Sequence, residues 1–363
     1  FDDLPYSDKF IKDFEKIAND DQIKIVVEVM GGLNPAYDFV KRLLLSGKSV
    51  VTSNKELVAA KGAELLKIAN ENNVNFMFEA SVGGGIPILR PMAQCLAANE
   101  ITEIKGILNG TTNYILNKMI VDNMDFDSAL SLAQEKGFAE KNPAADIEGH
   151  DACRKICILA SLAFGKHVYP EQVETKGITD ITLTDVEYAD EFNCAVKLIG
   201  QAKKCDNGKI TASVKPMLVS HNNILSNVDG VFNAIMVTGD AVGDVLFYGK
   251  GAGKMPTASA VVADVIDCAK HINARKYIDW ADGSPDYVIS PDQKVRLYVY
   301  IHSNDYDKLC KQFSDVFTDN TWHIKNDFKK EIAFITDEDY ESVLNNKINS
   351  IDADCIKIMH TLF

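Results

Sequence analysis

The N-terminal part of the chain alternates short apolar runs with longer stretches of helical periodicity. Continuous β-branched runs such as IKIVVEV are typical of buried strands, whereas apolar residues spaced three and four apart indicate helices. The expected strands are residues 23–29, 49–52 and 75–80, and the expected helices are residues 7–19, 35–45 and 55–71, the first with Ser7 as its cap. This order predicts a doubly wound α/β domain with a parallel sheet, whose ligands bind beyond the carboxyl ends of the strands.

The ends of these strands carry polar or glycine-rich sequences. They are Met30-Gly31-Gly32, Thr52-Ser53-Asn54-Lys55 and the stretch from Glu79 to Gly85. The consecutive glycines at 83–85 allow the backbone to approach a ligand closely. A flexible link is the alternative, but these glycines join a buried strand to the apolar segment 88–98, where a flexible link has no advantage. Lys55 is either a surface lysine at a helix start or a residue that faces the ligand.

Longer segments with alternating polarity follow from residue 101. The first strand ends at Asn109-Gly110, and Thr111 or Thr112 is expected to cap the helix that follows. Four further runs predict an antiparallel, half-exposed sheet covered by helices. They are residues 194–205, 209–220, 231–239 and 244–249. The glycines at 249–253 then precede an apolar helix, where a phosphate or ribose could bind, although no Rossmann strand comes before them.

The segment from Glu140 to Lys155, EKNPAADIEGHDACRK, concentrates acidic residues ahead of an apolar helix. Asp151 and Lys155 stand four residues apart, so on a helix they share one face. Such a pair taken alone is more often a solvated surface contact. The apolar sequence that follows supports the other interpretation, in which Lys155 is buried and its pKa is tuned for proton transfer.

Residues 290–363 repeat strands and helices in small units and predict a compact βαββαβ module, set off by the polar segment 282–292. A module of this kind more often regulates or dimerises than catalyses. Nothing in it has catalytic spacing.

The 363 residues carry a net charge of −14 and no basic block, which argues against nucleic acid as a partner. No apolar run approaches the roughly 18 residues of a membrane span, and the start has no signal-peptide pattern, so a soluble, cytoplasmic protein is expected. Eight scattered cysteines lack metal-ligand spacing and indicate free thiols in a reducing compartment. Because the chain opens on Phe1, we expect the natural N-terminus to lie upstream.

Several segments in this order resemble homoserine dehydrogenase. They are EASVGGGIPI (79–88), ILNGTTNYIL (107–116), the segment 140–155, TSNK (52–55) and GAGKMPTASAVVAD (251–264). The resemblance implies reversible hydride transfer between NAD(P)H and aspartate 4-semialdehyde, giving homoserine on the route to threonine, methionine and isoleucine. The C-terminal module is similar to the ACT-type regulatory domain of some members, although it lacks the usual glycine-containing turn after its first strand.

The family pattern, carried over by residue, implies a role for each acidic or basic residue of the site. Lys155 would exchange a proton with the substrate oxygen, with Asp151 beside it. Glu140 would bind the substrate amino group, with Asp146 as the matching acid of the loop. Lys55 would lie between cofactor and substrate. One departure is Asn142-Pro143, where the family usually has Asp-Pro.

The resemblance also implies where the cofactor and a cation bind. Gly251 and Gly253 match the loop that closes on NAD or NADP, and Met30 and Gly31 are expected on the cofactor side of the first strand. A monovalent cation, sodium or potassium, is expected at four residues, the first through its carboxylate and the others through backbone carbonyls. These residues are Glu79, Val82, Gly84 and Ile86.

Three domains are therefore expected. They are an incomplete Rossmann-type domain at 1–95 to which 250–275 returns, an α+β catalytic and dimerisation domain at 96–249, and an ACT-like α+β domain at 290–363. The strand, glycine loop and helix with which the family begins are not found ahead of residue 23, so we expect weak dinucleotide binding. The half-exposed central sheet favours a homodimer or homotetramer.

Two other functions stay open. One is a non-catalytic protein that dimerises or senses an amino acid. The other is a semialdehyde dehydrogenase that acts through a cysteine thioester, for which Cys95 would need an activating partner that the sequence does not indicate.

Overall fold

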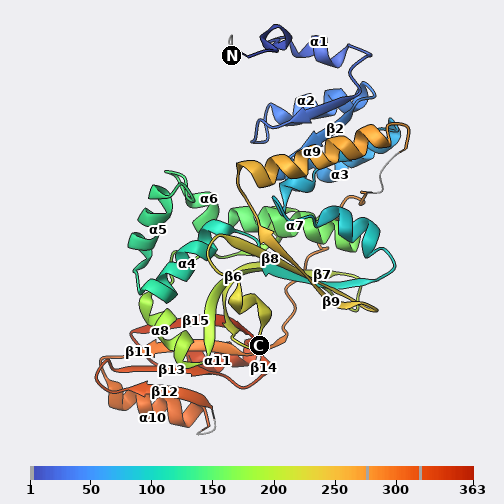
Figure 1. Ribbon diagram of the computed structural model, residues 1–363. Coiled ribbons are helices and arrows are strands. Elements are labelled where there is room, and N and C mark those ends of the chain that lie inside the picture. Colours follow the sequence, from blue (N-terminus) through green and yellow to red (C-terminus); the bar gives the residue numbers. More distant parts are fainter. Residues whose placement is uncertain (1–3, 275–277, 319–320) are drawn as a thin grey trace.

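The computed structural model describes residues 4–274, 278–318 and 321–363, which form an elongated molecule (Figure 1). An α/β unit lies at the N-terminal end, a broad sheet lies in the middle, and a smaller α+β module lies at the other end. Within these residues, no helix combines the length and the apolar character that crossing a bilayer requires.

Three short parallel strands form the sheet of the N-terminal unit in the order β1-β2-β3. The strands are β1 (Ile25–Glu28), β2 (Ser49–Thr52) and β3 (Phe76–Met77), and the helices packed with them are α2 (Ala36–Leu45), α3 (Lys55–Glu71) and α9 (Lys254–Lys270). This confirms the predicted parallel sheet with crossover helices. The carboxyl ends of β1 and β2 lie side by side because Glu28 and Thr52 are register partners.

Three predicted elements in this part of the chain are wrong in extent. The expected helix 7–19 is divided into η1 (Ser7–Lys9) and α1 (Phe14–Ala18), and Asp13 rather than Ser7 caps α1 by accepting the backbone N–H of Glu15. The expected strand 75–80 stops at Met77, because the chain turns into η2 (Glu79–Ser81). The expected helix 88–98 is reduced mainly to the short turn η3 (Pro91–Cys95).

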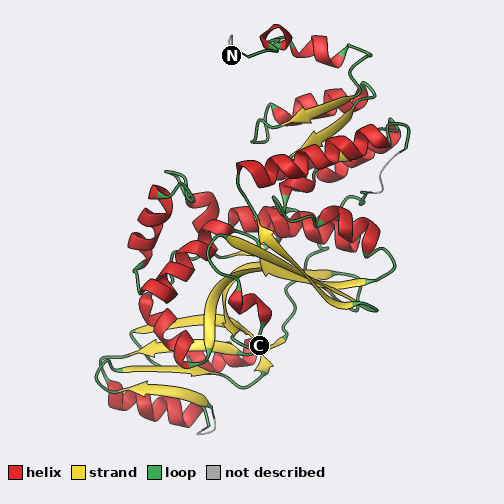
Figure 2. Cartoon of the chain, in the orientation of Figure 1, coloured by secondary structure: helices red, strands yellow, loops and turns green. Residues whose placement is uncertain are grey.

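The central sheet is largely antiparallel, as predicted, with strands in the order β7-β6-β4-β8-β9. Its strands are β4 (Ile101–Ile107), β5 (Glu174–Thr175), β6 (Cys194–Lys204), β7 (Ile210–Ser220), β8 (Phe232–Gly239) and β9 (Gly243–Lys250). Its helices are α4 (Gly110–Asp122), α5 (Phe126–Glu135), α6 (Ala144–Ile147), α7 (His150–Phe164), α8 (Leu183–Glu191), η4 (Pro170–Gln172) and η5 (Ile224–Asn227). Figure 2 shows α7 between this sheet and the N-terminal unit, and its contacts with α3, β6 and β7 agree.

The C-terminal module has the predicted βαββαβ order, with the four main strands arranged β12-β13-β11-β15. Its elements are β10 (Lys294–Val295), β11 (Leu297–His302), α10 (Tyr306–Val316), β12 (Trp322–Asn326), β13 (Glu331–Ile335), β14 (Asp339–Tyr340), α11 (Glu341–Asn349) and β15 (Cys355–Leu362). The module is not set off as expected, because β15 pairs in parallel with β7 and makes its sheet continuous with the central one. The periodicity of each strand cannot reveal this pairing, since it joins segments far apart in the chain.

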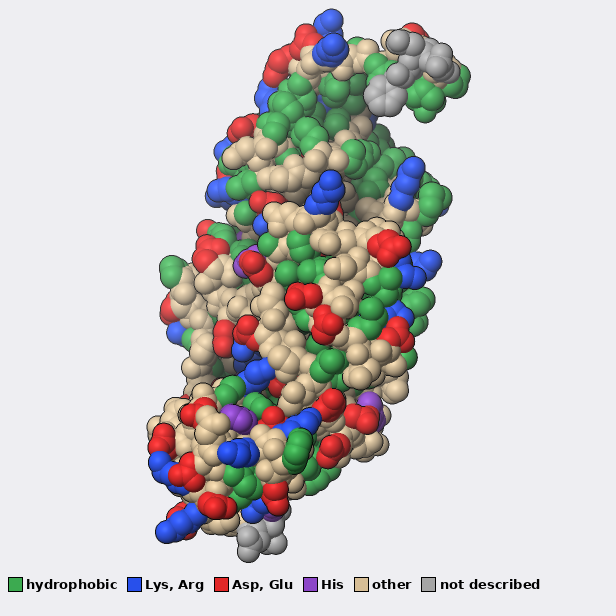
Figure 3. Space-filling model, turned by 90° about the vertical axis from the view of Figure 1, so that its left-hand side faces the viewer, with side chains coloured by type: hydrophobic (Ala, Val, Ile, Leu, Met, Phe, Trp, Pro, Cys, Tyr) green, Lys and Arg blue, Asp and Glu red, His purple; other side chains and the backbone are tan. Residues whose placement is uncertain are grey.

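The face of the molecule in Figure 3 mixes acidic and basic side chains, with no broad basic area. Apolar side chains gather on this face over the N-terminal unit.

Candidate active site

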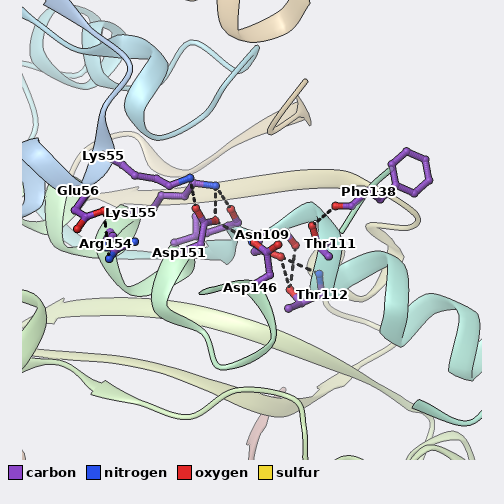
Figure 4. Close-up of polar contacts among 11 residues, drawn as sticks. Lys55, Glu56, Asn109, Thr111, Thr112, Phe138, Asp146, Asp151, Arg154 and Lys155 are labelled. Atoms are coloured by element: carbon purple, nitrogen blue, oxygen red, sulfur yellow. Dashed lines mark hydrogen bonds and ion pairs between the residues drawn. The ribbon is translucent and has the colours of Figure 1, made fainter. Parts of the chain in front are cut away.

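The first turn of α7 carries a buried ion pair. Gly149 starts the helix with a left-handed φ of 86°, which a glycine adopts without strain. Asp151 Oδ2 then lies 2.7 Å from Lys155 Nζ, one turn along the same face, and the two residues are 3% and 5% exposed (Figure 4). Lys155 also donates to the carbonyl of Leu108, 2.8 Å away at the end of β4. The pair is therefore not the solvated surface contact that was the alternative.

Lys55 brings a second ammonium to the same carboxylate. It is the first residue of α3, and the side chain of Asn54 caps that helix by accepting the N–H of Leu57. Lys55 Nζ lies 2.5 Å from Asp151 Oδ1, and its side chain is 40% exposed (Figure 4). One buried and one open ammonium thus share one aspartate where the N-terminal unit meets the central domain.

These charges shift the pKa values of the pair in a direction useful for proton transfer. Burial would raise the pKa of Asp151, but the positive charges of Lys155 and Lys55 outweigh it, so this pKa lies well below its ordinary value. Burial also lowers the pKa of Lys155, and the positive charge of Lys55 adds to the shift while Asp151 opposes it. Asp151 therefore stays ionised near neutral pH, while Lys155 loses its proton more readily than an exposed lysine.

Asn109 links this pair to Asp146. Its side-chain N–H groups donate to Asp146 Oδ1 at 2.6 Å and to Asp151 Oδ2 at 2.9 Å. Its carbonyl oxygen accepts the N–H of Thr112, so Asn109 caps α4, where a threonine was predicted to be the cap. Burial raises the pKa of Asp146, and the negative charge of Asp151 adds to the shift. The sequence analysis missed Asn109 as a site residue, although an Asn-Gly at the end of a strand is a recognisable signal for a cap.

Glu140 lies apart from this cluster. It is exposed on the loop between α5 and α6, and its backbone carbonyl accepts from Gln134. Among the described residues, no hydrogen bond or ion pair joins its carboxylate to Lys55, Asp151 or Lys155. Its role at the substrate amino group therefore stays a prediction.

Beyond β1, a buried carboxylate organises the loop where the cofactor was expected. Glu28 accepts the N–H of Met30 at 2.6 Å and that of Gly31 at 3.4 Å, and its other oxygen accepts from the Thr52 hydroxyl at 2.6 Å. The side chain of Asn54 donates to the carbonyl of Gly32. Met30 is exposed, and Gly31 has a φ of 77° with open space around its Cα. Glu28 and Asn54, which sequence reasoning did not single out, fix this loop.

The two glycine-rich loops, predicted separately, pack against each other. Gly85 donates its N–H to the carbonyl of Lys250 at 3.0 Å, and a Cβ on Gly84 would lie 2.3 Å from the carbonyl oxygen of Gly251. A Cβ on Gly251 would in turn lie 1.9 Å from Nδ2 of Asn233, which is 2% exposed. Gly253 precedes α9 with a φ of 123°. Close approach of the two loops to each other and to the Asn233 side chain explains the glycines better than a flexible link does.

The carboxylate of Glu79, one of the expected cation residues, holds the chain that follows it. It accepts three backbone N–H groups, those of Ile88, Leu89 and Arg90, at 2.6 to 2.8 Å. A carboxylate offers about four lone-pair sites, so these bonds leave one for a further partner, and the expected cation site stays a prediction. Asp264 lies behind, accepting from the Glu79 N–H and from Arg90, and burial raises the pKa of Asp264 to about 6. The backbone carbonyls of Val82, Gly84 and Ile86 remain as possible ligands.

Comparison with known proteins gives one consistent family. A family model described as homoserine dehydrogenase matches residues 87–266, and one described as the NAD-binding domain of homoserine dehydrogenase matches residues 5–79. A curated homoserine dehydrogenase of Synechocystis sp. is 47% identical over 259 residues, which are 70% of this chain and 60% of the relative. The chain thus spans about 60% of the length of that protein.

Solved structures agree with the sequence matches. The crystal structure of a homoserine dehydrogenase from Thiobacillus denitrificans superposes with a TM-score of 0.83 at 35% identity, over 96% of this chain and 84% of that one. A hyperthermophilic archaeal homoserine dehydrogenase mutant in complex with NADPH has a TM-score of 0.63 at 34% identity, over 72% of this chain and 76% of that one. With both family models matched along the same fold, the chain belongs to the homoserine dehydrogenase family.

Proposed function

We propose that this chain catalyses the reversible, NAD(P)-dependent oxidation of L-homoserine to L-aspartate 4-semialdehyde. The observation that carries the proposal is the Lys155 ammonium, which is buried against Asp151 and the Leu108 carbonyl and shares the Asp151 carboxylate with the partly exposed Lys55. Family membership supplies the reaction, and this cluster supplies the groups that such a reaction needs.

When bound, NAD(P)H would supply the hydride to the aldehyde carbon in the reduction. As the C=O bond becomes a C–O bond, negative charge develops on the oxygen, and an ammonium group within hydrogen-bond distance stabilises that charge. Lys155 has three N–H donors, and the structure gives two of them partners, Asp151 and Leu108. The third is available to donate its proton to the substrate oxygen. In the oxidation, the neutral amine accepts the hydroxyl proton as hydride leaves the carbon.

The substrate ammonium group needs carboxylates. We assign it to Asp146 and Glu140, which both lie on the chain leading from α5 to α7. Asn109 holds Asp146 next to Asp151, so a substrate bound there would have its far end within reach of Lys155. Glu140 is exposed on the loop between α5 and α6, so this loop would have to close over the substrate for the carboxylate to reach the substrate ammonium group.

For the dinucleotide, the residues at the ends of β1 and β2 fit a bound cofactor. The Met30–Gly31 loop is fixed from beneath by Glu28, and Gly31 presents backbone without a side chain. Gly251 and Gly253 would face the cofactor from the opposite loop, with Lys55 between cofactor and substrate. The NADPH named for the archaeal relative supports NADP as well as NAD as candidates.

A monovalent cation, sodium or potassium, would be held by the Glu79 carboxylate and the backbone carbonyls of Val82, Gly84 and Ile86. Oxygen ligands suit such a hard ion, and the Glu79 carboxylate, which accepts three N–H groups, has a lone pair left for it. Comparing activity in sodium, potassium and tetramethylammonium chloride at one ionic strength tests this site.

We also propose that the protein forms a homodimer or homotetramer through its central sheet. The outer strand β9 leaves Tyr248 exposed at the edge of that sheet. Light scattering that finds a monomer at high protein concentration would rule this out. We also propose that the C-terminal module, whose elements follow the ACT-like order, regulates the activity of the protein.

The assay that tests the function is homoserine-dependent reduction of NAD⁺ and NADP⁺ by the natural full-length protein. Binding of homoserine without turnover would favour the non-catalytic sensor instead. The thioester alternative has little support, because Cys95 is exposed and its pairing with a histidine is not seen among the described residues.

A further inference from the structure

A polar cavity that none of Lys55, Asp151 and Lys155 lines lies where the C-terminal module joins the central sheet. It has a volume of about 520 Å³ and is lined by β7, β15 and the chain entering β11. Four lysines and arginines and three glutamates face it, whereas the whole chain has 38 basic and 52 acidic residues. The side chains that line the cavity therefore carry a small excess of positive charge in a chain that is acidic as a whole.

Within the cavity, the Lys215 ammonium has few acceptors. The Lys215 side chain is 14% exposed, and its ammonium lies 3.1 Å from Nε2 of His360 and 3.7 Å from the carboxylate of Glu174. The second distance is too long for a hydrogen bond. The same Nε2 lies 3.0 Å from a Glu341 oxygen. One ring nitrogen cannot accept from Lys215 and donate to Glu341 at once.

Each tautomer of His360 therefore leaves one charged neighbour poorly paired. If Nε2 carries a proton for Glu341, its N–H faces the Lys215 ammonium. If Nε2 carries no proton, it accepts a hydrogen bond from Lys215, but its lone pair then faces the carboxylate of Glu341 and repels it. The Lys215 ammonium is largely buried and its ion pair with Glu174 is too long for a hydrogen bond, so an anion in the cavity that accepts from Lys215 would improve its pairing.

We propose that this cavity is a binding site for a small anion bearing a carboxylate or phosphate group. Lys215 and His360 form its inner end, and Arg296, which also lines the cavity, completes it from the entry to β11. Carboxylate and phosphate share the geometry that guanidinium and ammonium donors recognise. Because β7 and β15 each supply one of the inner residues, a bound anion stabilises the joint between the central sheet and the module.

The test is a calorimetric titration of the full chain with phosphate and, separately, with succinate at constant ionic strength. We expect saturable binding of at least one of them, weakened about tenfold or more in Lys215→Met, together with a rise in Tm at saturation. Lys209→Met is the matched control, since it removes a lysine paired with Asp286 at 2.9 Å outside the cavity, and it should bind like the parent. Binding of only one anion identifies which group the site prefers.

Two outcomes would overturn the proposal. One is the absence of saturable binding of either anion, and the other is equal weakening in Lys209→Met and Lys215→Met. If Lys215→Met fails to fold, the parent protein still decides the question through the imidazole proton signal of His360, assigned by its loss in His360→Gln. That signal should move with the same Kd as the calorimetric titration, and a signal that stays still at saturation contradicts the site.

Discussion

The Asp151 carboxylate lies 2.7 Å from the Lys155 ammonium one helical turn later, and both residues are almost fully buried. The other oxygen of the same carboxylate holds Lys55 at 2.5 Å. A single negative charge thus faces two positive ones, and burial favours the neutral form of the inner lysine. Lys155 is thus a buried ammonium whose pKa is lowered while it stays paired with a carboxylate.

Replacing Lys155 by methionine should lower kcat by about a hundredfold or more, which is the usual effect of removing a general acid. The variant should fold, because Asp151 keeps Lys55 as a partner and methionine fills a similar volume. Steady-state assays in both directions measure the loss. Lys118→Met is the matched control, since Lys118 also pairs with an aspartate one turn away, Asp122 at 2.7 Å, but on the surface of α4. Normal turnover by Lys155→Met would remove Lys155 from the mechanism.

The two reaction directions should depend on pH with opposite signs. In the proposed mechanism, aldehyde reduction needs the protonated Lys155, so its rate should fall as pH rises through the pKa of this lysine. Homoserine oxidation would need the neutral amine, so its rate should rise through the same pKa. Because burial lowers the pKa of Lys155, the shared midpoint should lie below the ordinary value of 10.5. Profiles of kcat/KM against pH in each direction measure it.

The variant Asp151→Asn gives this pH dependence a sharper test. The negative charge of Asp151 raises the pKa of Lys155, and the positive charge of Lys55 lowers it. Removing the negative charge should therefore move the midpoint to lower pH. A midpoint that stays in place or moves up would mean that another group titrates.

The Asp151→Asn variant should also lose about 3–5 kcal/mol of stability, because two ammonium groups are left without their carboxylate. Urea unfolding measures that loss.

Local sequence patterns predicted the parts of the structure that depend on neighbours in the chain. The bounds of α3 and the shared face of Asp151 and Lys155 follow from helical periodicity alone. Contacts between distant segments could not be predicted in this way. The meeting of Gly84 with Gly251, like the pairing of β15 with β7, depends on the tertiary arrangement. The family resemblance named both glycine loops but could not reveal that Asn233 lies beneath one of them.

A methyl group on Gly251 should disrupt the joined glycine loops. Its Cβ would lie 1.9 Å from Nδ2 of Asn233, a buried side chain that has little room to move. We expect Gly251→Ala to raise the KM for NAD(P)⁺ about tenfold or more, because the loop must shift away from its position facing the cofactor. Gly249→Ala is the control from the same loop, since its Cβ would meet only a side-chain atom of Ile86 at 3.2 Å. If the two variants are equally impaired, the contact with Asn233 is not the cause.

Glu28 should control cofactor affinity without touching the reacting atoms. Its carboxylate accepts from the N–H of Met30 and from the hydroxyl of Thr52, each at 2.6 Å, and so ties the β1 loop to β2. Glu28→Leu keeps the volume but leaves both donors without an acceptor, and each unsatisfied donor costs about 1–3 kcal/mol. We expect the Kd for NADPH to rise about tenfold or more, with a smaller change in kcat, because the loop loses its fixed shape.

The conservative variant Glu28→Gln distinguishes two reasons for the effect of Glu28 on cofactor affinity: its negative charge, and the hydrogen bonds by which it holds the loop in shape. Its amide oxygen can still accept from Met30 while its N–H₂ group donates to the Thr52 hydroxyl, so the loop should keep its form. Calorimetric titration should then find NADPH affinity within a few-fold of the parent protein. If Glu28→Gln binds as weakly as Glu28→Leu, the negative charge itself matters, and the view that Glu28 acts by holding the Met30–Gly31 loop is wrong.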